Sequence, residues 1–148
     1  NLIDIKIDYY VKINFKGVIN LVNALGGVDV DVPYSFCEQN SNREFGNKTI
    51  YVKEGLQHLS GEQALALARN RHSWPAYCDA KWTTGVRNDF VRGQNQQLVV
   101  GGIAKSIRSI NSPKEFYDIL NAISQNVDTN ISTNKLLSFY DVAKDIFG

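Results

Sequence analysis

The stretch NFKGVINLVNALGGVDVDVP, residues 14–33, decides the fold, because a helix pattern and a strand pattern meet within it. Its first half carries apolar residues at the i, i+3, i+4 and i+7 spacing of an amphipathic helix: Val18, Leu21, Val22 and Leu25. Asn14 is placed to cap that helix, and the glycine pair at 26–27 ends it. VDVDV at 28–32 then alternates as a half-buried strand until Pro33 stops it. A helix followed directly by a strand favours an α/β protein.

Outward from this stretch, strands are predicted at 9–14 and 49–52, and the polar residues 34–48 read as a loop. Further helices are predicted behind capping residues: GEQALALAR after Ser60, 89–109 after Asn88, one after Ser112-Pro113, and a last one from Ser132 or Thr133 through Phe147. Residues 72–87 read as a long loop, and long ordered loops are often functional. Helices and strands alternate early and helices dominate late. This predicts an α/β fold, a three-layer α/β/α sandwich around a central mixed sheet.

Composition places the chain among ordinary globular domains. It has 148 residues, 43% hydrophobic and 21% charged, which suits a single domain spanning residues 1–148. It has no apolar run long enough to cross a membrane and no signal peptide. It also has no methionine, so we expect a segment of a longer protein, from which membrane or export segments have been separated.

The charge is concentrated in one window. The net charge is +1, but residues 69–92 hold five Lys or Arg against two Asp, which leaves 11 basic and 13 acidic residues elsewhere. The window is therefore +3 and the remainder −2. A single local basic segment favours a small anionic ligand over nucleic acid, which usually needs a broad basic face.

Arg69 and Arg71 end the Ala- and Leu-rich helix. If the backbone is extended there, residues two apart point the same way, and two neighbouring guanidinium groups repel each other. A phosphate or pyrophosphate relieves that repulsion through bidentate hydrogen bonds, and the helix start at Asn88 adds free N–H groups. Asp89 is placed there to fix an arginine or to accept a proton. The plainer alternative is that each arginine is a solvated surface residue.

A stripe along the helix 89–109 changes from polar to apolar. The polar part holds Asp89, Arg92 and Gln96, and the apolar part holds Val99, Ile103 and Ile107. A ligand with a charged head and an apolar tail would match this change. The alternative is that the helix begins at the surface and continues into the core.

For the remaining candidate residues, the sequence does not decide between the possible roles. Cys37 and Cys78 lack metal-site spacing, and they are either a disulfide or two unpaired thiols. His58 and His72 have no partner at metal spacing. The aromatics of the 72–87 loop either stack on sugar rings or hold the loop in place: Trp74, Tyr77 and Trp82.

Three segments together resemble the LytR–CpsA–Psr family of cell-wall enzymes of Gram-positive bacteria: DYYVKINFKGVINLVNALGGVDVDVP (8–33), GLQHLSGEQALALARNRH (55–72) and NDFVRGQNQQ (88–97). The resemblance covers most of the chain. It implies an α/β sandwich with a hydrophobic lipid tunnel, in an extracytoplasmic domain that an N-terminal helix anchors to the membrane. Family members transfer teichoic acid or capsular polysaccharide from a polyprenyl-pyrophosphate carrier to peptidoglycan.

Carried over, Arg69 and Arg71 match the family's RxR pair, and Asp89, Arg92 and Gln96 match its DxxRxxxQ set. The resemblance implies that the three arginines and Gln96 bind pyrophosphate, and that Arg71, Arg92 and Asp89 act in catalysis. It also implies Mg²⁺. The family's metal-binding aspartates precede the region where this chain begins, so no metal ligand is assigned here, and we expect the segment alone to lack part of the machinery.

Other functions stay open beside the phosphotransferase. One is a DNA-binding transcriptional regulator, against which the near-neutral charge and the lack of a helix-turn-helix argue, so no nucleic-acid partner is expected. The other is a protein that binds the polyprenyl-pyrophosphate lipid or acts on it as a pyrophosphatase. The glycopolymer and the acceptor sugar are not specified by the sequence.

Overall fold

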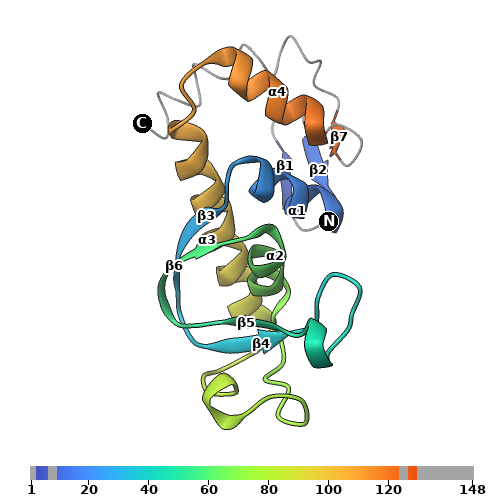
Figure 1. Cartoon of the computed structure of the whole chain (residues 1–148), viewed down its shortest axis with the longest axis vertical. Coiled ribbons are helices and arrows are strands. Elements are labelled where there is room, and N and C mark those ends of the chain that lie inside the picture. The colour runs from blue at the N-terminus through green and yellow to red at the C-terminus, as the bar shows by residue number, and fades with distance from the viewer. Residues whose placement is uncertain (1–2, 7–9, 124–126, 130–148) are drawn as a thin grey trace.

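The computed structural model describes residues 3–6, 10–123 and 127–129, and Figure 1 shows how their helices and strands are arranged. The helices are α1 (Phe15–Ala24), α2 (Gly61–Arg69), α3 (Asp89–Arg108) and α4 (Pro113–Ile123), with short 3₁₀ turns at Gly46–Lys48 and Ala80–Trp82. The strands are β1 (Ile3–Lys6), β2 (Tyr10–Ile13), β3 (Val28–Val32), β4 (Phe36–Glu38), β5 (Ile50–Val52), β6 (Gly55–Leu59) and β7 (Val127–Thr129). The last predicted helix lies outside the described residues.

The predicted α/β class is confirmed, and the described strands form three small antiparallel sheets. These are β1-β2-β7, β3-β6 and β4-β5. The sequence predicted one central mixed sheet, whereas no parallel pair occurs among the described strands. The difference arises because β3 does not pair with the strand that follows it. It pairs with β6, so that Val28 lies opposite Leu59 and Val32 opposite Gly55.

The deciding stretch folds as its pattern predicts. The Asn14 side chain accepts a hydrogen bond from the Gly17 N–H at 2.7 Å, which caps α1. Val18 and Val22 of α1 are fully buried, and the valines of β3 alternate inward with exposed aspartates. The two elements thus contribute to one hydrophobic core, which α2 and the middle of α3 complete.

Among the strands that were not predicted, β4 and β6 were missed for different physical reasons. β4 falls within the expected loop 34–48, and all three of its residues are buried, including Glu38. A buried glutamate breaks the alternation by which a strand is recognised. β6 directs Leu59 inward but leaves Leu56 exposed, so its apolar pattern is weak.

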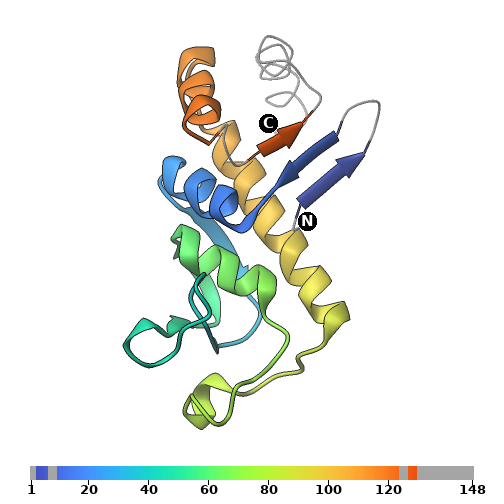
Figure 2. The same ribbon diagram turned by 90° about the vertical axis from the view of Figure 1, so that its right-hand side faces the viewer.

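The helices pack closely around α2. Figure 2 shows α1 and α2 beside each other, with the long α3 running past both, and α2 contacts each of these helices. α2 begins with a capping box in which Ser60 and Gln63 satisfy each other's backbone N–H groups. A Cβ at Gly61 would collide with the backbone of Ile19, so the close approach of α1 and α2 requires a glycine there. None of the helices in the described part of the chain combines the length and the apolar composition needed to cross a bilayer.

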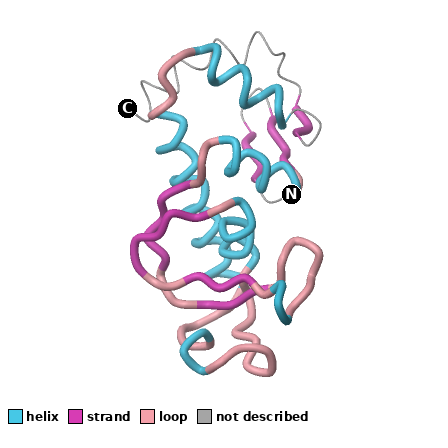
Figure 3. The backbone as a smooth tube through the Cα atoms, in the orientation of Figure 1, coloured by secondary structure: helices cyan, strands magenta, loops and turns pink. Residues whose placement is uncertain are grey.

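A disulfide between Cys37 and Cys78 fixes the long loop 72–87 to β4. Figure 3 shows this loop and the loop between β4 and β5 at the same end of the molecule. Arg87 closes the far end of the 72–87 loop. Its guanidinium lies 3.9 Å above the Tyr34 ring and donates to the carbonyl oxygens of Ser35 at 3.1 Å and Trp82 at 3.2 Å. The loop is therefore held near its middle and at its C-terminal end.

His58 connects β6 to β3 and to the turn after α1. Its Nδ1 lies 2.7 Å from Asp29 Oδ1, and its Nε2 lies 2.6 Å from the Gly26 carbonyl oxygen. Both partners are acceptors, so both ring nitrogens must carry a proton to satisfy them. The hydrogen bond that His58 donates to Asp29, and then the one that it donates to the Gly26 carbonyl oxygen, raise the pKa of His58 above its ordinary value.

We expect the disulfide to stabilise the folded chain by about 4 kcal/mol, because it closes a long loop in the unfolded state. Replacing both cysteines (Cys37→Ala with Cys78→Ala) should lower the free energy of unfolding, measured by urea denaturation, by roughly that amount. Adding a reductant to the double variant should change nothing further. An unchanged denaturation midpoint in the double variant would contradict the expectation.

We expect the His58 pKa, followed by NMR titration, to lie above about 6.5. Because the folded-state pKa is the raised one, the stabilisation is fully present below about pH 6.5 and is lost as the pH rises through the folded-state value. Asp29→Asn should return the pKa toward the ordinary value. Asp31→Asn removes the next carboxylate on the same face of β3 and serves as the matched control. An equal shift in both variants would show that general charge, and not the hydrogen bond, sets the pKa.

Candidate functional site

Arg71 and Arg92 converge on Asp89 where α2 ends and α3 begins. Arg92 Nη2 lies 2.6 Å from Asp89 Oδ1, and Arg71 Nε lies 4.0 Å from the same oxygen. The Asp89 side chain remains 69% exposed, and both guanidinium groups are also partly open to solvent. One carboxylate thus holds two cations at a surface position, and the three side chains together keep a net positive charge.

The start of α3 explains this convergence. Asn88 caps the helix by accepting the Val91 N–H at 2.9 Å, which places Asp89 in the first turn. Arg92 follows at i+3 and therefore lies on the same side of the helix as Asp89. The N-terminal turn also supplies unpaired backbone N–H groups and the positive end of the helix dipole. The site therefore suits an anion.

Gln96 and Arg69, the other two predicted anion ligands, have partners of their own. Gln96 Nε2 donates to the carbonyl oxygen of Ala68 at 3.4 Å, which ties the second turn of α3 to the end of α2. Arg69 donates to the Asn40 carbonyl oxygen at 3.3 Å, and its guanidinium lies 5.1 Å from the centre of the Phe15 ring. Burial lowers the pKa of Arg69. The structure thus brings Arg71, Asp89 and Arg92 together directly, and it places Arg69 against a different loop.

Asn70, between the two arginines, is a residue that the sequence analysis missed. It is fully buried, donates to Glu38 Oε1 at 3.0 Å and to the His72 carbonyl oxygen at 3.2 Å, and accepts the Tyr34 hydroxyl at 3.1 Å. Tyr34 in turn accepts from Asn95 Nδ2 at 2.8 Å. This buried network fixes the backbone from which Arg71 projects. The only signal for it in the sequence is an asparagine directly after a helix, which is also common at exposed helix ends.

The basic window of the sequence is therefore not one patch. Arg87, which it contains, is engaged with Tyr34 and backbone carbonyl groups, and burial lowers its pKa. Lys81 lies over the Trp82 ring, 5.5 Å from its centre. Burial also raises the pKa of Tyr34 and keeps its hydroxyl protonated as the donor to Asn70. Of the four arginines in the window, only Arg71 and Arg92 pair with Asp89 in the described structure.

The predicted lipid-contacting stripe lies in the core. Val99 and Ile103 are buried in the main hydrophobic cluster, and Ile107 packs against it. This placement matches the alternative that α3 begins at the surface and continues into the core. The contact of Val99, Ile103 and Ile107 with a lipid stays a prediction.

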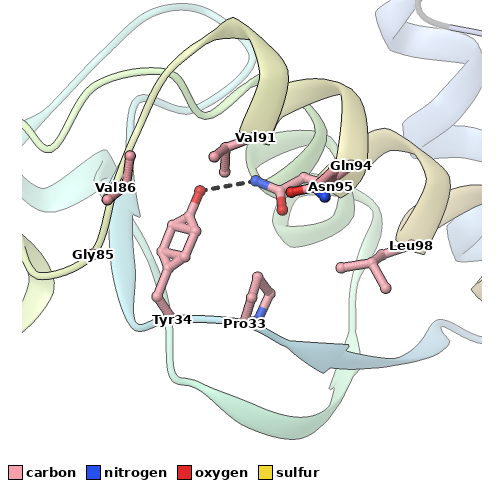
Figure 4. Close-up of a pocket in the computed structure, with 8 residues that line it drawn as sticks. All are labelled: Pro33, Tyr34, Gly85, Val86, Val91, Gln94, Asn95 and Leu98. Atoms are coloured by element: carbon pink, nitrogen blue, oxygen red, sulfur yellow. Dashed lines mark hydrogen bonds between the residues drawn. The ribbon is translucent and has the colours of Figure 1, made fainter.

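A pocket of about 470 Å³ lies on a different face of α3, between that helix and the segments around Tyr34 and Gly85. Figure 4 shows its lining, with Val91, Asn95 and Leu98 from α3.

The described residues do not fit a magnesium site. Mg²⁺ prefers oxygen ligands, chiefly carboxylates. No group of three or more His, Cys, Asp or Glu side chains that could hold a metal ion occurs among the described residues. Asp89, the carboxylate of the site, is already paired with two arginines.

Comparison with known proteins identifies relatives of this chain. The model of the LytR_cpsA_psr family matches residues 1–146. The chain is 34% identical to a Bacillus subtilis protein named polyisoprenyl-teichoic acid–peptidoglycan teichoic acid transferase TagV, over 96% of this chain and 33% of TagV. It is 35% identical to Biofilm regulatory protein A of Streptococcus mutans, over 99% of this chain and 34% of that protein.

The fold agrees with these sequence matches. The crystal structure of Bacillus subtilis TagV superposes with a TM-score of 0.71 at 32% identity, covering 95% of this chain and 48% of the TagV chain. The chain spans about one third of the length of the curated relatives it matches. With the family model covering nearly all of its residues, the chain belongs to the LytR_cpsA_psr family.

Proposed function

We propose that the protein transfers a phosphate-linked glycopolymer, such as teichoic acid or capsular polysaccharide, from a polyprenyl-pyrophosphate carrier to peptidoglycan. The observation that carries this proposal is the pair of guanidinium groups held by Asp89 at the start of α3. Relatives named as teichoic acid transferases support the same reaction class. The site offers what a pyrophosphate requires, namely forked N–H donors, a helix N-terminus and positive charge.

In the proposed reaction, a sugar hydroxyl of peptidoglycan attacks the phosphorus atom nearest the glycan. A new P–O bond forms to that hydroxyl oxygen, the bond from the same phosphorus to the bridging oxygen breaks, and polyprenyl phosphate leaves. The hydroxyl proton passes to solvent or to the leaving phosphate. Arg71 and Arg92 stabilise the negative charge that builds on the phosphate oxygens, which is the main catalytic contribution in phosphoryl transfer.

Asp89 orients the arginines in this proposal. Its Oδ1 is within 2.6 Å of the Arg92 guanidinium, so its charge is already committed to that partner. A carboxylate in such a pair fixes the direction of the donors. We propose that Arg69 and Gln96 assist at the edge of the site, where they reach the pyrophosphate once their side chains leave the carbonyl oxygens of Asn40 and Ala68.

We propose further that the protein acts outside the cytoplasm, anchored to the membrane. The disulfide between Cys37 and Cys78 supports an oxidising compartment, because such bonds rarely persist in the cytosol. For Mg²⁺, we propose ligands other than the described residues, whose carboxylates do not gather at the site. We propose that Val99, Ile103 and Ile107 contact the lipid when it binds between α3 and its neighbours.

We expect Arg71→Ala and Arg92→Ala each to reduce glycopolymer transfer at least about a hundredfold, because each removes a charge-stabilising donor. The measurement is transfer of labelled lipid-linked glycan to peptidoglycan by the whole protein that carries this chain. Lys105→Ala is the matched control, because it removes a positive charge from the last turn of the same helix. Wild-type transfer by either arginine variant would reject the assignment.

The same assay separates the proposed reaction from its alternatives. Incorporation of label into peptidoglycan supports transfer, release of soluble glycan phosphate indicates a pyrophosphatase, and retention of intact lipid indicates a binding protein. Melting temperatures of the variants should stay within a few degrees of the wild type, because Arg71 and Arg92 are both partly exposed.

A further inference from the structure

An aromatic cluster lies just after Arg71 in the loop 72–87. Tyr77 stacks face to face on Phe45, with ring centres 4.0 Å apart and planes 1° from parallel. Trp74 packs edge-on against Phe45 at 5.0 Å and against Tyr77 at 6.1 Å, and the His72 ring meets Trp74 at 5.2 Å. The cluster thus joins the 72–87 loop to the loop between β4 and β5, at the end of the molecule that Figure 3 shows as loops.

These contacts hold the loop in place, yet they leave Tyr77 open. Tyr77 is 57% exposed, although Phe45 covers one face of its ring. More than half of the residue therefore remains accessible to a ligand in spite of this contact. An aromatic ring that served only to hold the loop would be expected to bury both faces, because burial of apolar surface is what stabilises such a contact.

The cluster is also rigid. Cys78, the next residue, is bound to Cys37 of β4 by the disulfide. The N–H groups of Tyr77 and Cys78 both donate to the Trp74 carbonyl oxygen, at 3.0 Å and 3.1 Å, which fixes the turn between them. A surface fixed in advance loses little conformational entropy when a ligand binds, so a single exposed face contributes usefully to affinity.

The position of the cluster links it to the anion site. Trp74 follows Arg71 by three residues, so their Cα atoms are at most about 11 Å apart. The intervening backbone is fixed, because the His72 carbonyl oxygen accepts from buried Asn70. Tyr77 lies three residues after Trp74, and its N–H is fixed to the Trp74 carbonyl oxygen, so a short and fixed segment of backbone connects Arg71 with the cluster.

We propose that Tyr77, supported by Phe45 and Trp74, forms a stacking platform for the pyranose ring of the first sugar attached to the pyrophosphate of the donor lipid. This inference rests on the proposed function, since it assumes that Arg71 and Arg92 hold that pyrophosphate. The C–H groups of one sugar face are weakly positive and pack on the negative face of an aromatic ring. The platform selects lipids that carry a sugar over bare polyprenyl pyrophosphate.

The test compares two probes on the whole protein that carries this chain: geranylgeranyl pyrophosphate, and the same pyrophosphate joined to N-acetylglucosamine. We expect Tyr77→Ala to weaken binding of the sugar-bearing probe roughly five- to tenfold and to leave binding of the bare probe unchanged. Tyr77→Phe keeps the ring and should bind both probes as the wild type does. Tyr117→Ala, which removes an exposed tyrosine of α4, is the matched control and should change neither affinity.

The outcomes separate the platform from the proposed function. If Tyr77→Ala weakens the binding of both probes equally, or of neither, the platform is overturned and the proposed arginine site is unaffected. Chitotetraose, a soluble mimic of the acceptor glycan, serves as a third probe. If Tyr77→Ala weakens binding of chitotetraose alone, the assignment of the platform to the donor sugar is overturned. Bare-probe binding that Arg71→Ala does not weaken would instead contradict the proposed function, and the platform with it.

Discussion

The buried side chain of Asn70 is the contact on which the arrangement of the site depends. It lies where α2 ends, and its amide is satisfied by Glu38 of β4, by Tyr34 after β3 and by the backbone of His72. A buried amide left without partners costs about 1–3 kcal/mol, so the partners of Asn70 favour one relative position of α2, β4 and the segment after β3. Asn95 extends the same network into α3 through Tyr34. The direction in which Arg71 leaves the core follows from it.

The second constraint is electrostatic, and it acts at the surface above that network. Two guanidinium groups near each other repel, and Asp89 reduces this repulsion without neutralising it. Because all three side chains are partly exposed, water screens the pairs, and their contribution to stability is small. The ion pairs therefore add little to folding, and the anion binding that we propose would give the arrangement a role. An anion that enters between the guanidinium groups gains from both, whereas the folded protein gains little from holding them there.

The sequence predicted those parts of the structure that local patterns determine. The caps at Asn14, Ser60 and Asn88 fixed the starts of three helices, and the spacing of Asp89 and Arg92 predicted their contact. It failed where a long-range contact overrides the local pattern. β4 is a strand whose buried Glu38 depends on Asn70, far along the chain. Arg69 contacts Phe15 and Asn40, which its spacing from Arg71 does not predict, and its sharing of one ligand with Arg71 stays a prediction.

The loop between Arg71 and Asn88 is held by more contacts than a moving lid would allow. The disulfide ties its middle to β4, stacking on Phe45 ties Tyr77, and Arg87 ties its end to Tyr34. Lids close by changing backbone angles at a few hinge residues, and restraints of these kinds would have to break first. The loop therefore contributes to the site as a fixed wall. A ligand that meets such a wall does not have to order it, so the contacts it makes with the arginines are expressed as affinity and orientation.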